Sequence, residues 1–375
     1  MKKIYFILFI LSLLSYLSKS VDIQLNRNTI SKLIGKVREE LVDKSLLYLP
    51  SKNKVNILEM GNEMKKAIKE YSLSNIESAY LVFKWINQNL IANFSNSKTN
   101  DATKTYNLGK GSPKGMSSVF STICGFLDLK TESISGYLKW YNRTDRWNEE
   151  LEIIKNYTWN IIEIDGELYL IDVSMAYDVK KNNFPEYMYW YFGTYPEIFI
   201  RLHFPYESKY QLLSKSITLE KFESMAMLNP SFYLYGFKNI SPDTNKLSGT
   251  GKIILTSNEF IPAYELEFYE YEGDMTKSVR SKSDGEPNGI IEIDYDIDDY
   301  KGVIEYIRFY YDFLDSYYET IPLVYYSTSY SKFSSWNFNL IAKTNLNIQN
   351  EKYLLSNFLR KSKSFKGKKY ENMKG

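Results

Sequence analysis

The sequence of 375 residues contains one cysteine, one histidine and only ten prolines. A single cysteine excludes an intramolecular disulfide, so the core must be stable without a covalent cross-link. One cysteine and one histidine cannot supply a structural zinc site, and we expect no cofactor and no metal. The internal apolar runs stay well below the roughly 20 residues that a membrane-spanning helix needs.

An excess of one charge is also missing, because 47 basic residues face 45 acidic ones. Together with the lack of any nucleic-acid-reading motif, this balance excludes a nucleic-acid partner. The length allows two or three domains, and a hydrophobic content of 44% is typical of a globular protein. The 34 tyrosines indicate a compositional bias of the genome rather than an aromatic binding surface.

Residues 1–20 have the layout of a secretory signal peptide. Lys2 and Lys3 precede an apolar run from Ile4 to Leu17, and small residues follow at 18–20. We therefore expect a secreted protein, or one that stays in the secretory pathway. Cleavage of the signal peptide removes three of the 47 basic residues and leaves 44 basic residues against 45 acidic ones. The alternative is an uncleaved signal anchor, which would be the only contact with a membrane.

Four acceptor sequons for N-glycosylation agree with export: they begin at Asn93, Asn142, Asn156 and Asn239. In an oxidising compartment the lone thiol must be buried, paired with another chain, or reactive. At the other end, residues 346–375 form a basic tail, with seven basic residues and one acidic residue from Arg360 to Lys374. Such a tail is expected to be solvated.

Helical spacing and capping signals mark the first part of the chain. Apolar residues recur at helical spacing over 30–41, which predicts a helix there. Ser74 and Glu77 form a capping box for a second helix. The polar segment 93–111 has the composition of a loop.

The stretch "GSPKGMSSVFSTICGF" (111–126) predicts a helix that begins after Ser112. Serine is a good N-cap, and Pro113 suits the first helical position because it lacks an N–H. Cys124 falls on the apolar stripe of this helix, where a free cysteine usually packs in the interior.

Strands are predicted from residue 132 onward. Segments 132–140, 159–164 and 167–171 alternate, and Asp165-Gly166 is a strong signal for a two-residue hairpin turn. Segment 186–194 resembles another strand, and a short helix is predicted to start near Thr218. From about Ser248, short alternating strands predict an antiparallel β-sandwich. There Glu292, Asp294, Asp296 and Asp298 share one strand face, which indicates a solvated surface rather than a calcium site.

The order of these segments resembles the transglutaminase-like core of the kyphoscoliosis-peptidase (KY) family over roughly residues 76 to 228. The most specific stretch is Tyr191 to Leu213, with His203-Phe204-Pro205 inside it. The resemblance implies an α+β fold: a papain-like core followed by β-sandwich domains. It also implies a Cys-His-Asp triad for acyl transfer, with peptide hydrolysis or glutamine transamidation as the reaction.

Carried over residue by residue, most of that triad is missing. The position of the nucleophile holds Pro113, the position of the base holds Tyr157, and only Asp172 matches, with no imidazole expected beside it. Cys124 lies eleven residues after Pro113, about 16 Å along a helix, which is too far for the same cleft. His203 is expected to be structural, and Ser112 and Ser117 would be unactivated hydroxyls without a base. No catalytic residue is therefore expected.

The sequence thus favours a catalytically degenerate, secreted transglutaminase-like protein that binds an extracellular protein or peptide. Its candidate cleft consists of Ser112, Trp159 and Asn160 beside the degenerate triad. An active cysteine peptidase or protein-glutamine transferase with a relocated nucleophile is the alternative, and it needs Cys124 and His203 to meet. A carbohydrate-binding adhesin built on the sandwich is a third hypothesis.

The expected domains follow from these boundaries. They are a signal peptide (1–20), an N-terminal helical segment (21–75), a transglutaminase-like core (76–235), a β-sandwich domain (240–345) and the basic C-terminal tail (346–375).

Overall fold

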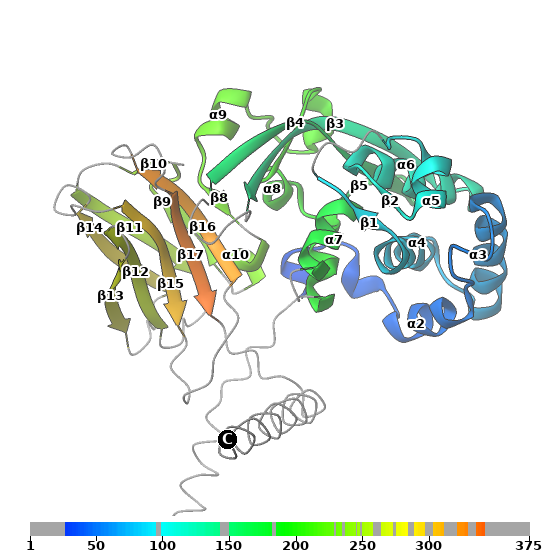
Figure 1. The fold of residues 1–375 in the computed structure, drawn as a ribbon, viewed down its shortest axis with the longest axis horizontal. Coiled ribbons are helices and arrows are strands. Elements are labelled where there is room, and N and C mark those ends of the chain that lie inside the picture. Colours follow the sequence, from blue (N-terminus) through cyan, green and yellow to red (C-terminus); the bar gives the residue numbers. More distant parts are fainter. Residues whose placement is uncertain are drawn as a thin grey trace, which may run out of the picture. The chain divides into compact units, whose positions relative to one another are not determined.

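The computed structural model describes residues 27–94, 99–142, 150–181, 185–228, 230–234, 237–244, 246–247, 250–257, 264–272, 275–283, 289–296, 303–310, 321–328 and 335–341. The predicted signal peptide and basic tail lie outside these residues. Helices and antiparallel sheets both occur in the described chain, which confirms the α+β class (Figure 1). The domain boundaries and the sandwich arrangement of the later strands stay predictions.

The N-terminal segment differs from the helix predicted over 30–41. Two short 3-10 helices, η1 (Arg27–Thr29) and η2 (Ile34–Lys36), precede α2 (Glu39–Tyr48). The segment instead bonds to a sheet edge, because Ser31 bridges Thr194 and the Ser31 hydroxyl donates to the Phe192 carbonyl at 2.5 Å. Ile30, Leu33 and Ile34 are buried there, so their spacing reflects burial in an irregular segment. The prediction of one helix over 30–41 is wrong for this reason.

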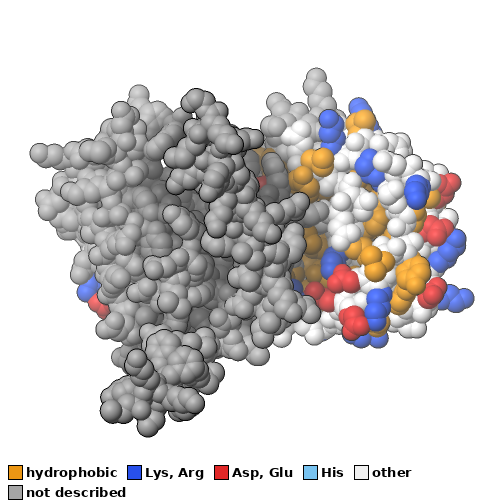
Figure 2. Space-filling view, turned by 60° about the horizontal axis from the view of Figure 1, so that its bottom comes forward, with side chains coloured by type: hydrophobic (Ala, Val, Ile, Leu, Met, Phe, Trp, Pro, Cys, Tyr) orange, Lys and Arg blue, Asp and Glu red, His pale blue; other side chains and the backbone are white. Residues whose placement is uncertain are grey.

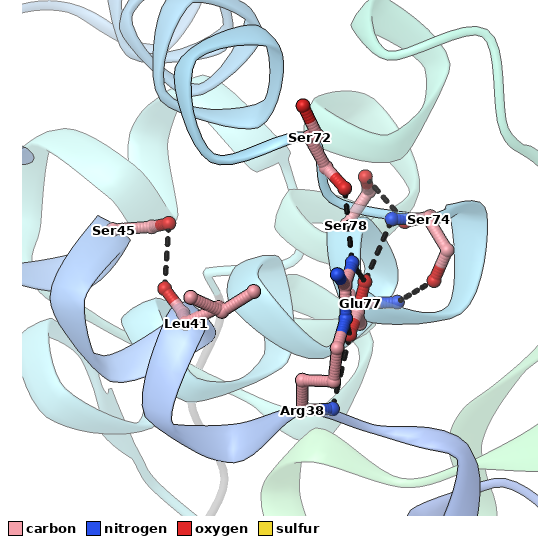
Figure 3. Close-up of polar contacts among 7 residues, drawn as sticks. All are labelled: Arg38, Leu41, Ser45, Ser72, Ser74, Glu77 and Ser78. Atoms are coloured by element: carbon pink, nitrogen blue, oxygen red, sulfur yellow. Dashed lines mark hydrogen bonds and ion pairs between the residues drawn. The ribbon is translucent and has the colours of Figure 1, made fainter.

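An ion pair ties this segment to α4 (Asn75–Asn89) (Figure 3). The Arg38 Nε and Nη2 atoms each donate to the Glu77 carboxylate at 2.6 Å, and Nη2 also reaches the Ser72 carbonyl. Glu77 additionally accepts from the Ser74 amide, as the predicted capping box requires. The Arg38 guanidinium lowers the pKa of the buried Glu77 to about 2.

Two further helices follow, of which the first lies in the segment 21–75 that is expected to be helical, although the sequence does not predict its bounds. The first, α3 (Ile57–Tyr71), begins with an Asn56/Glu59 capping box. The second, α5 (Ala102–Leu108), lies in the segment expected to be a loop; it is capped by Asp101 and ends at Gly109, whose φ is +67°. Strands β1 (Ile91–Ala92) and β2 (Lys110–Gly111) flank it and pair in parallel. The loop prediction for 93–111 is therefore wrong over these residues, because about two turns of helix need no long apolar stripe.

The helix α6 (Pro113–Phe126) begins as predicted, with the Ser112 hydroxyl accepting from the Gly115 amide at 3.1 Å. It packs on strands β3 (Lys130–Asn142) and β4 (Glu150–Ile164), and α3, α4 and α5 contact it (Figure 1). Its buried stripe runs from Met116 to Cys124. The sequence therefore placed the central helix correctly.

An antiparallel five-stranded sheet has the order β6-β5-β4-β3-β7. It adds β5 (Glu167–Ile171), β6 (Phe192–Thr194) and β7 (His203–Pro205) to the two long strands. The predicted hairpin is confirmed, and Asp165 and Gly166 both have positive φ, as a tight two-residue turn of this kind requires. The strand predicted over 186–194 is mostly wrong, because η3 (Pro185–Tyr191) occupies it and only its end pairs.

Short helices follow or connect these strands. They are α7 (Val173–Lys181), α8 (Pro196–Phe199), η4 (Ser208–Gln211), α9 (Leu219–Ser224) and α10 (Pro230–Leu234). The helix predicted near Thr218 is confirmed as α9, with the Thr218 side chain as its N-cap.

Within the sheet, Lys139 is a fully buried lysine whose Nζ donates to the Phe222 and Met225 carbonyls at the end of α9.

The strands after α9 confirm the prediction that the later part of the chain is rich in short β-strands. They are β8 (Met227–Leu228), β9 (Phe237–Ser241), β10 (Lys246–Leu247), β11 (Thr250–Ser257), β12 (Tyr264–Glu272), β13 (Met275–Ser283), β14 (Ile290–Asp296), β15 (Val303–Tyr310), β16 (Ile321–Thr328) and β17 (Ser335–Ile341). One sheet has the order β14-β11-β9, and a second has the order β10-β16-β17-β15-β12-β13 with β8 on β16. Nearly all pairs are antiparallel, while β10 and β16 run parallel.

The surface of the described residues is mixed in character. Figure 2 shows hydrophobic side chains between basic and acidic ones over the coloured part of one face. Leu47 and Tyr48, at the end of α2, are the most exposed of the large hydrophobic residues. Among the described residues no helix is both long and apolar enough to cross a membrane.

Gly136 and Gly125 give opposite predictions for an added methyl group. A Cβ at Gly136 would lie 2.1 Å from the Phe204 carbonyl oxygen of β7, whereas one at Gly125 would meet nothing within 4 Å. We expect Gly136→Ala to lower the free energy of unfolding by about 1–3 kcal/mol through overpacking. Gly125→Ala, on α6, should raise it by up to about 1 kcal/mol. Urea titrations followed by tryptophan fluorescence compare the two, and equal effects would contradict the close strand contact.

Candidate functional site

Asp172, which the sequence resemblance matches to the acid of a triad, is a fully buried carboxylate between β5 and α7. Its Oδ1 accepts the backbone amides of Ser174 at 2.8 Å and Met175 at 3.0 Å, so it caps α7. Its Oδ2 accepts the Tyr157 hydroxyl at 2.9 Å and lies 2.8 Å from His203 Nε2. Four donors therefore satisfy this carboxylate, as a buried charge requires.

The contact with His203 corrects the expectation that Asp172 has no imidazole to orient. His203 reaches it from β7, whose pairing with β3 places Leu138 opposite His203. For this hydrogen bond Nε2 must carry a proton, since the carboxylate only accepts. Nδ1 is buried and has no hydrogen-bond partner among the described residues.

Aromatic rings fix the imidazole plane. Phe199 stacks on it with ring centroids 3.8 Å apart, and Trp159 meets it edge-on at 5.3 Å. Tyr191 contacts it at 6.2 Å. The His203 side chain is completely buried by these neighbours, which agrees with the structural role expected from the sequence.

Tyr157, where the sequence resemblance implies the base, is buried on β4 and donates its hydroxyl to Asp172. Burial, and then the negative charge of Asp172, raise the pKa of Tyr157 well above its usual value. The phenol therefore stays protonated across the physiological range and acts as a donor. It cannot take a proton from a nucleophile as an imidazole would.

Pro113, where the sequence resemblance implies the nucleophile, is the first residue of α6. The preceding Ser112 hydroxyl is already used, because it caps the helix and donates to the Asn100 Oδ1 at 2.5 Å. A chain of contacts connects this helix end to Tyr157. The Asn93 amide donates to the Gly111 carbonyl at 2.8 Å, and the next residue, Phe94, stacks on the Tyr157 ring at 6.2 Å.

The candidate cleft residues Trp159 and Asn160 are buried as well. Asn160 Nδ2 donates to the Ser121 hydroxyl at 2.8 Å and to the Ser117 carbonyl at 3.2 Å, so it fixes α6 to β4. The Ser117 hydroxyl shares a hydrogen bond with Ser133 at 2.9 Å. These residues hold the helix on the sheet and present no open surface to a peptide.

Cys124 lies in the interior, as predicted, with no exposed surface. Burial raises the pKa of its thiol, so the thiolate that would attack a carbonyl is disfavoured. Among the described residues, Asp172 is the polar partner of His203, and no hydroxyl or thiol bonds to the imidazole. The arrangement thus has an acid and an imidazole but no nucleophile within hydrogen-bond reach.

The remaining sequence-predicted sites are placed as follows. Asn156 and Asn239 are exposed, Asn93 is half-buried, and the side chain of Asn142 lies outside the described residues. Asn156 is the extra residue of a β-bulge opposite Gly136 and Tyr137, with φ of +60°.

In the acidic strand, Glu292 is exposed and pairs with Lys252 at 2.5 Å, while Asp298 lies outside the described residues. No group of three metal-ligating side chains occurs in the described part of the chain.

Sequence reasoning missed the pairing of His203 with Asp172 and the packing of Phe94 on Tyr157. A signal existed for the first, since the chain has a single histidine and the sequence resemblance matches Asp172 to the acid that orients one. The order of β7 beside β3 is what brings them together, and no local pattern reports strand order.

Comparisons with known proteins point to one distant relationship. No family model matches the chain. The mouse kyphoscoliosis peptidase is 21% identical over 224 residues, which cover 56% of this chain and 33% of the mouse protein. The human kyphoscoliosis peptidase is 26% identical over 155 residues, covering 40% of this chain and 23% of the human one. The chain therefore spans a third or less of these curated relatives, and the similarity supports a distant transglutaminase-like relationship.

Proposed function

We propose that this protein is a secreted, non-catalytic transglutaminase-like module that binds an extracellular protein or peptide. The observation that carries the proposal is the Tyr157 hydroxyl, which donates to Asp172 at 2.9 Å where a catalytic base would stand. A phenol with a raised pKa in that place gives no general base. Since function depends on the site and not on the fold, we propose that a fold without these catalytic groups acts by binding.

The residue at the expected position of the nucleophile supports the same proposal. Proline at the first position of α6 has neither a nucleophile nor an N–H to stabilise an oxyanion there. The thiol that a relocated mechanism would need is fully buried in the same helix, several turns further on. The described site thus has no nucleophile for acyl transfer.

One observation favours the alternative, an active cysteine peptidase or protein-glutamine transferase. His203 and Asp172 form an imidazole–carboxylate pair at 2.8 Å, the arrangement that orients a catalytic base. The imidazole uses Nε2 for Asp172, and its Nδ1 faces no nucleophile among the described residues. The alternative therefore requires a rearrangement that exposes Cys124 beside it.

Labelling of the full chain with iodoacetamide separates the two hypotheses. We expect Cys124 to be modified at least about a hundredfold more slowly in the native protein than in denaturant, because the thiol is buried and protonated. Peptide hydrolysis and amine transfer to a glutamine peptide should stay at background in the native chain and in Cys124→Ser. Fast native labelling, with turnover that Cys124→Ser and Cys124→Ala both abolish, would overturn the proposal.

Export and the domain plan belong to the same proposal. The layout of residues 1–20 and the exposed sequon asparagines Asn156 and Asn239 support a secreted glycoprotein. The antiparallel strands from β11 onward support a β-sandwich after the core, in line with the short alternating segments of the sequence.

A further inference from the structure

The segment around the start of α6 carries positive charge with little to balance it. Between Asn89 and Asp128 the sequence has one acidic residue, Asp101, and four lysines. This composition is unusual in a chain whose total charges nearly cancel. It coincides with β1, α5, β2 and α6, the elements that surround the position of the missing nucleophile.

Three lysines and two aliphatic residues of these elements, together with Lys52 from the loop before α3, form what we call the lysine face: Lys52, Ile91, Lys104, Leu108, Lys110 and Lys114. Ile91 lies opposite Lys110 in the β1–β2 pair, and its amide donates to Gly109. Leu108 precedes Gly109, and the Lys52 side chain lies against that same glycine, with Nζ 2.5 Å from where a Cβ would stand. Lys104 is one helical turn before Leu108, so both occupy one side of α5.

The lysines of this face have no acidic partner among the described residues. Lys104, Lys110 and Lys114 are exposed, and Lys52 donates only to the neutral Asn53 side chain, at 3.0 Å. Other exposed lysines do have partners: Lys44 pairs with Glu40, Lys66 with Glu63 and Lys130 with Glu163.

The acidic groups nearby are already used. Asp101 caps α5 by accepting the Lys104 amide at 2.8 Å, and Glu59 takes part in the capping box of α3. The field of the lysine face is therefore positive, and it would accelerate and strengthen association with an anionic partner.

The two aliphatic residues decide the kind of partner. Ile91 and Leu108 are each 52% exposed; Ile91 lies opposite Lys110, and Leu108 follows Lys104 by one helical turn. A sulfated glycan supplies anions but no apolar groups to cover them. A bilayer gains little from two half-exposed side chains that rise from a short strand pair and a helix end. An acidic peptide with aliphatic side chains satisfies both requirements.

We infer that the lysine face is the docking surface of this protein for an acidic, aliphatic-containing peptide segment of its partner. The inference rests on the proposed binding function and names the surface and the chemistry of the partner. The peptide would then bind beside the candidate cleft and not in it, because the cleft residues themselves are buried.

The test is binding of the full chain to a labelled peptide of alternating Glu and Leu, followed by fluorescence anisotropy. The double variant Lys110→Glu with Lys114→Glu should weaken binding by about tenfold or more, and added salt should weaken the native interaction. The matched control, Lys69→Glu with Lys215→Glu, reverses two exposed lysines outside this face and should change affinity less than about twofold. Glutamate near the start of a helix is favourable, so Lys114→Glu should not unfold α6.

Further arms distinguish the partner classes. Leu108→Ser should weaken binding of the Glu–Leu peptide but not of heparin, and a peptide of alternating Gln and Leu should not bind. Equal peptide affinity in the reversed and native proteins would overturn the inference. So would binding of heparin or phosphatidylserine vesicles without binding of the peptide. Failure here leaves the thiol-labelling result unaffected, so the two proposals can fail separately.

Discussion

Replacing Asp172 by alanine should destabilise the protein more than any other single substitution in the site, by about 3–5 kcal/mol. The change leaves the Tyr157 hydroxyl, His203 Nε2 and two backbone amides without their acceptor, all in the interior. Each buried donor without a partner costs free energy because water no longer satisfies it. Chemical denaturation followed by tryptophan fluorescence measures the difference.

Two matched variants complete this experiment. Glu63→Ala removes an acid from a surface pair with Lys66 and should cost no more than about 0.5 kcal/mol. Tyr157→Phe removes one donor and keeps the carboxylate satisfied by the others, so it should fold with a loss of about 1.5 kcal/mol. It remains measurable even if Asp172→Ala does not fold. Near-native stability of both Asp172→Ala and Tyr157→Phe would show that the carboxylate does not stabilise the fold.

The second large effect is a pH dependence caused by Lys139. Its ammonium group is fully buried in β3, and burial lowers its pKa from 10.5 to about 7. Positive Arg201 and Lys221 also lower this pKa, whereas Asp243 and Glu223 raise it. Between the two pKa values the unfolded chain binds a proton that the folded chain does not. The free energy of unfolding should therefore rise with pH from about 7 to about 10.

The expected slope is up to about 1.4 kcal/mol per pH unit in this window. Lys139→Met should flatten it, whatever it does to the absolute stability, while Lys130→Met on the surface should leave it unchanged. Urea titrations from pH 7 to 9.5 are suitable, because buried tyrosines such as Tyr80 affect stability only near and above pH 10. A native slope equal to that of Lys139→Met would show that the amine keeps its proton in the fold.

The sequence predicted those parts of the fold that depend on neighbouring residues. The capping box of Ser74 and Glu77, the Ser112-Pro113 start of α6 and the Asp165-Gly166 turn all have local causes, and all three are confirmed. The burial of Cys124 followed from the apolar stripe of the same helix. Local propensity and burial pattern agree at these places, so a single window of sequence is sufficient.

The errors arose where distant segments decide the structure. Ile30, Leu33 and Ile34 have helical spacing but bury against the β6 edge, which lies some 160 residues later in the chain. The partner of Asp172 depends in the same way on β7 lying beside β3. In the candidate site, the identities of Pro113 and Tyr157 could be read from the sequence. The His203 contact and the closure by aromatic rings required the tertiary fold.

The bulge at Asn156 has a consequence for biosynthesis. Asn156 is turned outward, and its backbone amide and Oδ1 both contact the Tyr206 hydroxyl, but the next two residues of its sequon, Tyr157 and Thr158, are buried in the sheet. A glycosyltransferase that must bind all three residues of the sequon could not reach them once β4 has paired with its neighbouring strands. Any sugar on this asparagine must therefore be attached to the nascent chain, and the timing of strand assembly would set how many molecules receive it.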